Sequence, residues 1–238
     1  MAKRGKVTFP VSVESIDRTF NPRKYQWALY IFCEDEKTEV AYFDQFLIAF
    51  PERTVFLKTV GTGMDPLGVV NMAVAEIAHH AERHATQPDE TWVVFDVDDA
   101  DKDEKKGARF AEAITKAGFK GIQVACSHEV FELWLLMHLK YIHPHPPLPR
   151  KLIYLELENA IRLALGPSEE YVYQHGKLEV IQRISQLGAE TSAIRNALAL
   201  ESYWAAKQER YISSNPRTHV YKLVQRLREL IAYHSYVS

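Results

Sequence analysis

The feature that most constrains the fold of this chain is the regular alternation of short apolar runs with amphipathic stripes through its first 140 residues. The apolar runs have strand length and little polar content, which is typical of strands covered on both faces of a sheet. They are residues 27–33, 54–60, 91–95 and 121–126. The stripes have helical spacing and lie at about residues 43–50, 66–83, 108–117 and 129–140. This order predicts an α/β fold, with a mainly parallel four-stranded sheet, right-handed crossovers and helices on both faces.

The pattern becomes helical after a proline-rich stretch, which holds four of the eleven prolines. Such a stretch continues neither a helix nor a central strand, so we interpret residues 143–150 as a linker. It separates a predicted α/β domain, residues 25–142, from an all-helical C-terminal region, residues 151–238. The helices predicted in that region are at about residues 152–165, 178–203 and 218–233. Residues 1–24 are basic and weakly patterned, which favours a mostly irregular arm.

Several classes of protein are excluded by what the chain lacks. No apolar run approaches the roughly 18 residues of a membrane span, and no apolar segment of a secretory signal follows the basic start. The two cysteines, Cys33 and Cys126, are too few for a disulfide scaffold and fit a reducing cytoplasm. We therefore expect a cytoplasmic protein with no membrane partner.

Acidic residues follow two of the predicted strands at the point where each strand ends. Glu34 comes directly after the first run, and Asp96 and Asp98 follow the third. The carboxyl ends of parallel strands form one edge of a sheet, which is where ligands bind in open α/β folds. Clustered carboxylates there would make an oxygen-rich pocket suited to Mg²⁺ or Mn²⁺. The competing interpretation is a solvated acidic loop.

Glu132 is unusual because it lies on the apolar face of a predicted helix, in line with Leu135, Leu136 and Leu139. An unpartnered carboxylate in a core would cost several kcal/mol. We therefore expect Glu132 to be partnered, to bind a metal or to lie at the rim of the core. A rim glutamate in the first helical turn, where the helix dipole favours negative charge, is the alternative without a catalytic role.

Other metal and nucleotide sites fit the sequence poorly. A calcium loop beginning at Asp99 would place Glu104 where a glycine is needed and Phe110 where a bidentate glutamate is needed. His80 and His84 are spaced so that both would lie on one face of a helix, but the chain contains no Cys-x-x-Cys motif that would complete a zinc site with them. No phosphate-binding loop of the Walker type occurs, so the chain is not expected to hydrolyse ATP by itself.

Basic residues concentrate late in the chain, interleaved with aromatic ones between residues 203 and 228. The chain has 29 Lys and Arg against 31 Asp and Glu, so binding of nucleic acid by bulk charge is excluded and a local patch is required. Cations with aromatic rings suit phosphate contacts and base stacking. The candidate nucleic-acid-binding residues are Lys207, Arg210, Arg217, Lys222, Arg226 and Arg228. An amphipathic helix with a charged outer face is the competing interpretation.

Four motifs in the chain resemble the RloB-like family, bacterial proteins of the Toprim superfamily found in phage-defence and restriction-type loci. The motifs read Cys-Glu-Asp-Glu-Lys-Thr-Glu at 33–39, Phe-Asp-Val-Asp-Asp at 95–99, Ser-His-Glu-Val-Phe-Glu-Leu-Trp-Leu-Leu-Met-His at 127–138 and Asn-Pro-Arg-Thr-His-Val-Tyr-Lys-Leu-Val at 215–224. The chain departs from the family pattern where Asp35 replaces a glycine and where His128 and Glu129 replace Asn-Pro.

The resemblance implies a Toprim fold for residues 25–142, as a catalytic domain with Glu34, Asp96 and Asp98 as ligands of Mg²⁺ or Mn²⁺. In related topoisomerases, primases and OLD-type nucleases, this triad handles phosphodiester chemistry. Lys37, just after Glu34, would offset charge on the transition state, or would be a surface lysine in the first turn of a helix. The resemblance also implies an ABC- or AAA-type ATPase partner encoded nearby.

The expected function is that of a metal-dependent nuclease, acting on RNA (including tRNA) or DNA as the effector of a two-component antiphage system. Glu34, Asp96, Asp98, Lys37 and Glu132 are the expected catalytic residues. The alternative is a non-catalytic module that binds a nucleotide or metal and docks on the ATPase. A primase- or topoisomerase-like activity is less well supported, because no candidate zinc-binding domain is present. We expect the region after residue 150 to serve recognition and to contribute no catalytic group.

Overall fold

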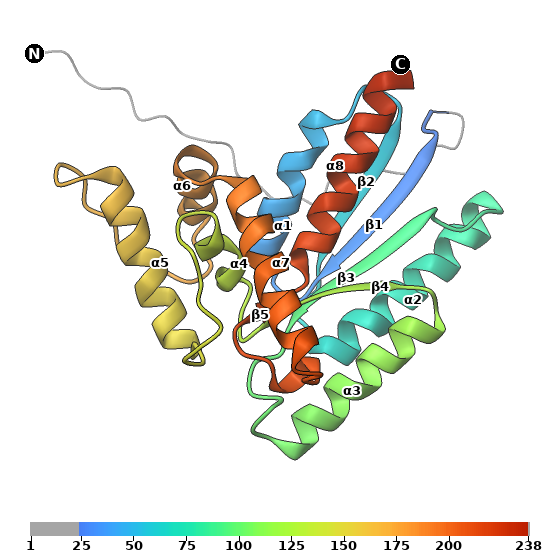
Figure 1. The fold of residues 1–238 in the computed structure, drawn as a ribbon. Helices are drawn as coiled ribbons and strands as arrows, with labels where there is room; N and C mark the ends of the chain where they lie inside the picture. Colours follow the sequence, from blue (N-terminus) through green and yellow to red (C-terminus); the bar gives the residue numbers. More distant parts are fainter. Residues whose placement is uncertain (1–23, 238) are drawn as a thin grey trace, which may run out of the picture.

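The computed structural model describes residues 24–237, so the predicted basic arm falls outside the described residues except for Lys24. The described chain forms one sheet with the strand order β2-β1-β3-β4-β5. The strands are β1 (Trp27–Cys33), β2 (Val55–Gly61), β3 (Glu90–Asp96), β4 (Gln123–His128) and β5 (Arg217–Thr218). The first four strands are parallel, and β5 pairs antiparallel with β4 (Figure 1). The expected parallel four-stranded arrangement is therefore present, with one further strand at its edge.

Eight α-helices surround this sheet in the described part of the chain. The first four are α1 (Thr38–Asp44), α2 (Pro66–His84), α3 (Glu104–Phe119) and α4 (Glu132–Met137). The remaining four are α5 (Arg150–Leu165), α6 (Glu179–Leu187), α7 (Glu190–Ala206) and α8 (Val220–Val237). Two short 3-10 helices, Gln45–Ala49 and Tyr211–Ser213, complete the assignment. None of these helices has both the length and the apolar character needed to cross a bilayer.

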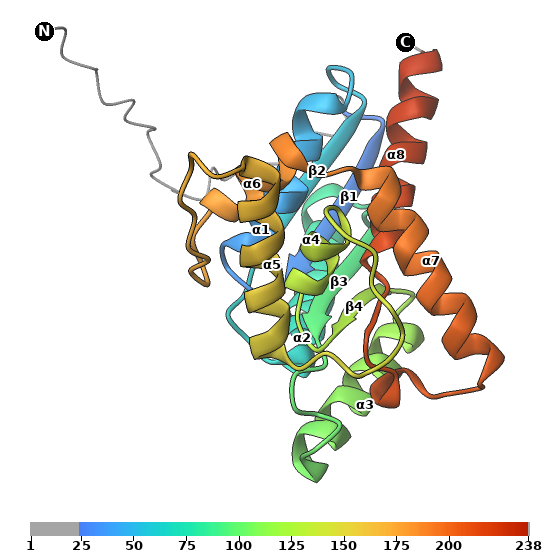
Figure 2. The same ribbon diagram turned by 60° about the vertical axis from the view of Figure 1, so that its left-hand side comes forward.

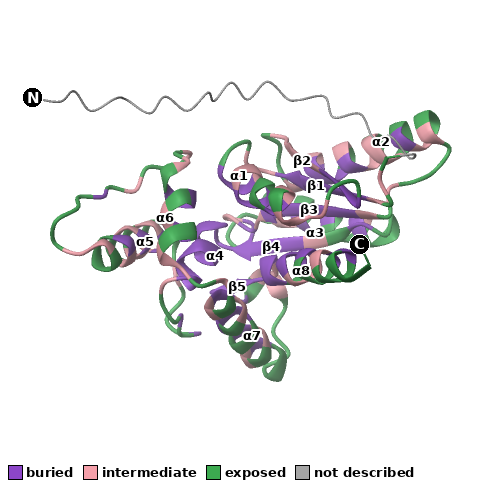
Figure 3. Cartoon of the chain, turned by 90° about the horizontal axis from the view of Figure 1, so that it is seen from above, coloured by how far each residue is buried: buried purple, intermediate pink, exposed green. Residues whose placement is uncertain are grey.

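Side chains of β1 alternate between two hydrophobic cores, one on each face of the sheet. Tyr30 and Phe32 pack in the core that includes residues of α2 and α3. Leu29 and Ile31 pack in a second, larger core with residues of α1, α4 and α8. Because successive side chains of a strand point to opposite faces, a continuously apolar strand needs cover on both. Figures 1 and 3 show the two helical layers on either side of the sheet.

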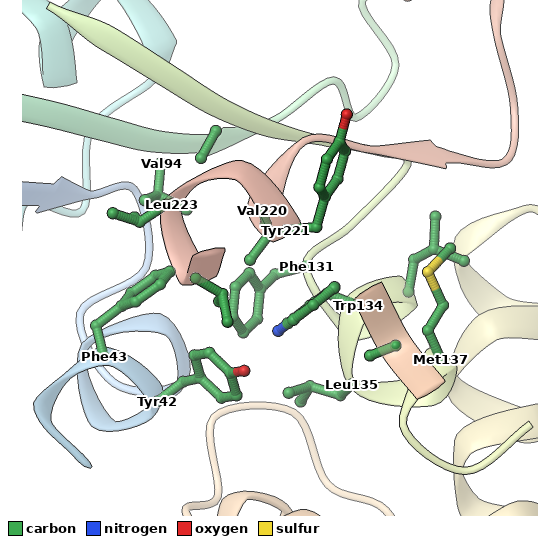
Figure 4. Close-up of a cluster of buried hydrophobic side chains, with 14 of the residues drawn as sticks. Tyr42, Phe43, Val94, Phe131, Trp134, Leu135, Met137, Val220, Tyr221 and Leu223 are labelled. Atoms are coloured by element: carbon green, nitrogen blue, oxygen red, sulfur yellow. The ribbon is translucent and has the colours of Figure 1, made fainter. Parts of the chain in front are cut away.

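The larger core joins the segments before and after the proline-rich stretch. Phe43 of α1, Trp134 of α4 and Leu223 of α8 are fully buried in it, and Figure 4 shows them within one cluster of buried side chains, with Phe131 between Phe43 and Trp134. The helices α5 and α7 also contact α4, and Figure 2 shows α5 and α6 beside it. Residues 25–142 and the C-terminal helices thus share one hydrophobic core, although residues 143–149 connect them as an irregular segment and residue 150 already begins α5.

The C-terminal region is not all-helical, because it supplies β5 to the sheet. Thr218 pairs with Ser127 of β4, and their hydroxyl oxygens lie 3.0 Å apart. The phenol of Tyr211 also donates hydrogen bonds to the carbonyls of Cys126 and Arg217 across this edge. A strand of two residues is too short to produce an alternating pattern, so the sequence carries no periodic signal for it.

Two predicted helices have different bounds in the structure. The helix expected over residues 178–203 is divided into α6 and α7 at Gly188, where an added Cβ would lie 2.7 Å from the Cβ of His138. The helix expected over residues 129–140 is confined to α4. The side-chain amide of Asn196 donates to the carbonyls of Met137 (3.0 Å) and Lys140 (2.9 Å), so tertiary contacts satisfy the groups where that helix ends.

Candidate active site

Two acidic residues meet at the carboxyl edge of the sheet because β1 and β3 are neighbours. Glu34 follows β1, and its backbone N–H donates to the carbonyl of Val94 in β3 at 2.9 Å. Its carboxylate Oε2 accepts a hydrogen bond of 2.9 Å from the backbone N–H of Asp96. The Glu34 side chain therefore lies directly against the end of the neighbouring strand.

Asp96 points into the protein from the end of β3. Its Oδ2 accepts a hydrogen bond of 3.1 Å from the backbone N–H of Phe131, the residue before α4. Its Oδ1 is buried and has no hydrogen-bond partner among the described residues. A buried carboxylate oxygen without a donor is costly, which makes this atom a natural ligand for a cation.

Asp98 is held by two contacts in a left-handed turn, with φ of 51°. Its backbone N–H donates to the carbonyl of Glu129 at 3.1 Å. Its carboxylate is ion-paired with the guanidinium of Arg150, the first residue of α5. Glu129 strengthens this connection, because its carboxylate accepts hydrogen bonds from the backbone N–H of Arg150 (2.8 Å) and from the Lys102 ammonium (2.7 Å). Glu129, one of the two residues that replace the Asn-Pro of the motif, thus connects the loop of Asp98 to α5.

Asp35, the other departure from the family motif, caps the start of α1. Its carboxylate accepts hydrogen bonds from the backbone N–H groups of Lys37 (3.2 Å) and Thr38. Its own N–H donates at 3.1 Å to Glu39, which is only 1% exposed. The backbone at residue 35 is not left-handed, so this turn does not require the family's glycine. Glu39 is an additional buried carboxylate that the spacing of strand ends did not reveal.

Glu132 is buried, with 2% of its surface exposed, and it is partnered. Its Oε1 accepts a hydrogen bond from the Tyr173 hydroxyl and lies 3.3 Å from Nδ1 of His175. Both partners come from the segment between α5 and α6. Glu132 is thus partnered in the structure, which is one of the three states that the sequence left open. Arg150, Tyr173 and His175 come from the C-terminal region and contact carboxylates of the acidic site.

Burial and mutual repulsion raise the pKa values of these carboxylates. Loss of solvation raises the pKa of Glu34 to about 7. The pKa of Asp96 is raised well above its ordinary value, first by burial and then by the negative charges of Glu39, Glu34 and Glu132. Burial also raises the pKa of Asp98, although the nearby Arg150 opposes the effect. Ionising all of these carboxylates at once is therefore unfavourable in the metal-free protein.

The donor set fits a hard divalent cation in kind, because it consists of carboxylate oxygens and one of them is unsatisfied. As the side chains are placed, however, no three Asp, Glu, His or Cys residues between 24 and 237 form a group that would hold a metal ion. Glu34 is turned to the backbone of Asp96, and Asp98 is paired with Arg150. Convergence of Glu34, Asp96 and Asp98 on one ion stays a prediction.

Lys37 is exposed in the turn before α1 and lies beside the segment that carries His175. A Cβ added at Gly176 would lie 3.9 Å from the Cδ of Lys37. Its ammonium group is therefore free to approach a ligand between this turn and the α5–α6 segment, as a role in charge stabilisation would require.

The six basic candidates do not form one continuous patch. Three of them are held by carboxylates of the same chain, Arg217 by Glu201, Arg226 by Glu90 and Arg228 by Glu190. Arg226 lines a cavity with Glu90, at the amino end of β3, whereas Lys207 lines a cavity of about 600 Å³ with Glu129, beside the acidic site. Lys207, Arg210 and Lys222 form no ion pair within residues 24–237 and remain the candidates for contact with nucleic acid.

A family model described as "RloB-like protein" matches residues 29–227. The match covers most of the chain, including all four motifs and every carboxylate of the site, so the chain belongs to the RloB-like family. Searches of curated proteins and of solved structures found no match.

Proposed function

We propose that this RloB-like protein is a metal-dependent nuclease of the Toprim type, which hydrolyses RNA or DNA as the effector of a two-component antiphage system. The observation that carries the proposal is the group of carboxylates at the carboxyl edge of a parallel sheet, with Oδ1 of Asp96 buried and unsatisfied. An ABC- or AAA-type ATPase partner and a cytoplasmic location belong to the same proposal. The two buried free cysteines suit a reducing compartment.

In this mechanism, Glu34, Asp96 and Asp98 would hold one or two Mg²⁺ or Mn²⁺ ions, which would polarise the phosphate and lower the pKa of a bound water. If Glu34 instead serves as an acid or base, it is suited to accept a proton near neutral pH, because burial raises its pKa to about 7 in the metal-free protein. Asp98 would have to leave its ion pair with Arg150 in order to hold a metal ion. The guanidinium of Arg150 would then be available to donate two hydrogen bonds to two oxygens of a phosphate. Lys37 would add positive charge as the transition state forms.

A non-catalytic binding module is the second candidate, and one observation favours it. The pairing of Asp98 with Arg150, together with the lack of a three-ligand group among the described residues, is what a site without a catalytic set of metal ligands would show. In that case the pocket would bind a nucleotide or a metal without cleaving nucleic acid, and the C-terminal helices would dock on the ATPase partner.

The deciding experiment is to incubate the protein with the ATPase encoded nearby, Mg²⁺ or Mn²⁺, and either labelled total RNA or plasmid DNA. Glu34→Gln and Asp96→Asn should abolish cleavage, because each removes a charged oxygen ligand and keeps the shape of the side chain. Glu36→Gln, an exposed change in the same turn, is the matched control and should cleave like the wild type. Undiminished cleavage by both site variants would contradict the proposal, and metal binding without cleavage by the wild type would favour the binding module.

Contact with nucleic acid is tested separately, without the ATPase. Alanine at Lys207 and Lys222 together should weaken filter binding of RNA or DNA and reduce its salt dependence, by about one unit of slope for each phosphate that is no longer neutralised. Alanine at Arg226, which is engaged by Glu90, should have a smaller effect. Equal affinity and slope for the double variant and the wild type would remove these lysines from the interface.

A further inference from the structure

The segment between α5 and α6 brings a histidine to the acidic site. Nδ1 of His175 lies 3.3 Å from the buried carboxylate of Glu132, while 62% of the His175 side chain is exposed. Its other ring nitrogen, Nε2, has no hydrogen-bond partner among residues 24–237. One nitrogen of the ring is thus fixed by a carboxylate, and the other is free for a ligand.

The histidine is held in position by more than this one hydrogen bond. The ring of Tyr154, one turn after Arg150 in α5, lies 5.0 Å from the ring of Tyr173 and 5.9 Å from the ring of His175, measured between centroids. The Tyr173 hydroxyl donates to the same carboxylate oxygen of Glu132. A buried acid and two stacked tyrosines therefore restrict where the imidazole can point.

We propose that His175 is the general acid of the phosphodiester hydrolysis, with Glu132 as its positioning residue. The inference rests on the proposed nuclease function and assigns a proton donor that the carboxylates do not supply. A carboxylate that accepts from Nδ1–H fixes the tautomer and orientation of an imidazole and stabilises its protonated form, leaving Nε2–H to donate. The expected roles of Glu34, Asp96 and Asp98, by contrast, concern metal binding and the attacking water.

The hydrolysis balances in atoms and protons. The oxygen of a water forms a bond to phosphorus, the bond from phosphorus to the leaving oxygen breaks, and that oxygen takes the proton of His175 Nε2. The attacking water releases one proton to a carboxylate of the site. Solvent then returns a proton to the imidazole and removes one from the carboxylate, so the enzyme ends as it began.

The groups around the imidazole determine its charge at neutral pH. Glu132 of α4 and Asp35 of the turn before α1 favour the protonated form, whereas Arg150 of α5 and partial burial oppose it. Lys37 lies beside Gly176, the next residue in the segment. The hydrogen bond to Glu132 is the largest influence, and the pKa of His175 is raised above its ordinary value. These contacts therefore favour the proton-donating form of the imidazole.

The test compares two substrates that differ in their need for an acid. Cleavage of an oligonucleotide releases an alkoxide that needs a proton, whereas bis(p-nitrophenyl) phosphate releases a weakly basic nitrophenolate that does not. His175→Gln should slow the oligonucleotide reaction by roughly 100-fold or more and leave hydrolysis of the nitrophenyl ester within about fivefold of the wild type. The matched control is Gln174→Ala, an exposed neighbour, which should change neither rate.

Equal losses by His175→Gln on both substrates would overturn the proposal, because they would show a structural role. An unchanged oligonucleotide rate would also overturn it. A wild-type protein that hydrolyses neither substrate in the presence of the ATPase partner and Mg²⁺ or Mn²⁺ would refute the nuclease function itself, a result distinct from both.

A second measurement follows the imidazole directly, by NMR titration of the metal-free protein. Glu132→Gln should lower the pKa of His175 toward its ordinary value, and the fall in activity at high pH should move to lower pH with it. Tyr173→Phe, which keeps the stacked ring and the Glu132 carboxylate, should leave His175 titrating above its ordinary value. A His175 pKa that is the same with and without the Glu132 charge would exclude Glu132 as the positioning residue.

Discussion

Replacing Glu34 with glutamine should stabilise the metal-free protein, by an amount that depends on pH. The glutamine keeps an oxygen that accepts from the N–H of Asp96 but removes the charge that burial disfavours. The pKa of Glu34 is raised from its ordinary value of 4.5 to about 7. At roughly 1.4 kcal/mol per pKa unit, the buried charge destabilises the wild type by about 3 kcal/mol once the site is ionised.

The direction of this pH dependence follows because the folded protein binds the proton of Glu34 more tightly than the unfolded chain does. The folded protein holds the Glu34 proton up to about pH 7, whereas the unfolded chain loses it near 4.5, so wild-type stability falls between these values and then levels off. The gain from Glu34→Gln should therefore be near zero at pH 4 and about 3 kcal/mol at pH 8. For a chain of this size, that gain corresponds to a Tm higher by roughly 6–12 °C at pH 8.

The assay is urea unfolding, or a thermal scan, of the metal-free protein at several pH values between 4 and 8. Glu36→Gln serves as the control and should show no pH-dependent gain, since its side chain is exposed. A gain of equal size at pH 4 and pH 8, or no gain at any pH, would refute the reasoning that Glu34 is held in an unfavourably buried, charged state.

Three further predictions concern the framework of the site. Gly61→Ala should cost about 1–3 kcal/mol in urea unfolding, because its Cβ would lie 2.5 Å from the Cα of Glu36; a midpoint equal to that of the wild type would show that the turn adapts. Glu201→Gln should cost about 3 kcal/mol at pH 7 by leaving Arg217 without its charged partner. Because the pKa of Glu201 is lowered, this difference should shrink as the pH falls below about 4.5, and a constant difference would contradict it. Arg150→Ala should lower the Tm of the metal-free protein, and added Mg²⁺ should raise the Tm by more than in the wild type; equal increases would show that the guanidinium does not compete with the metal.

Much of the sheet could be predicted, because parallel strands that are covered on both faces have sequences that are continuously apolar. The run at Trp27–Cys33 coincides with β1, and the placement of Glu34 and Asp96 at strand ends follows from it. The neighbouring positions of β1 and β3 then bring these two residues together. Here the local pattern and the topology agree, so the acidic edge could be expected from the chain alone.

The residues that contact the carboxylates of the acidic edge have no comparable pattern in the sequence. Arg150, Tyr173 and His175 follow Pro149 or lie between helices, and their distance from the carboxylates depends on how α5 packs against α4. Tertiary packing has no period along the sequence, so the same histidine could equally have faced solvent. Glu39 belongs to the first motif, yet only the fold shows that its carboxylate is buried beside those of the acidic site.

The antiparallel strand β5 also bears on the order in which the protein is made. It pairs at the far edge of a sheet whose other strands all lie before residue 129, and α8 completes the core around Trp134. A ribosome delivers residues one after another, so the early strands and their carboxylates emerge while β5 and α8 are still missing. Contacts between such distant segments form slowly. A nascent chain therefore first carries the acidic edge without Arg150 and His175, and the core beneath the pocket closes only once β5 and α8 have also been made.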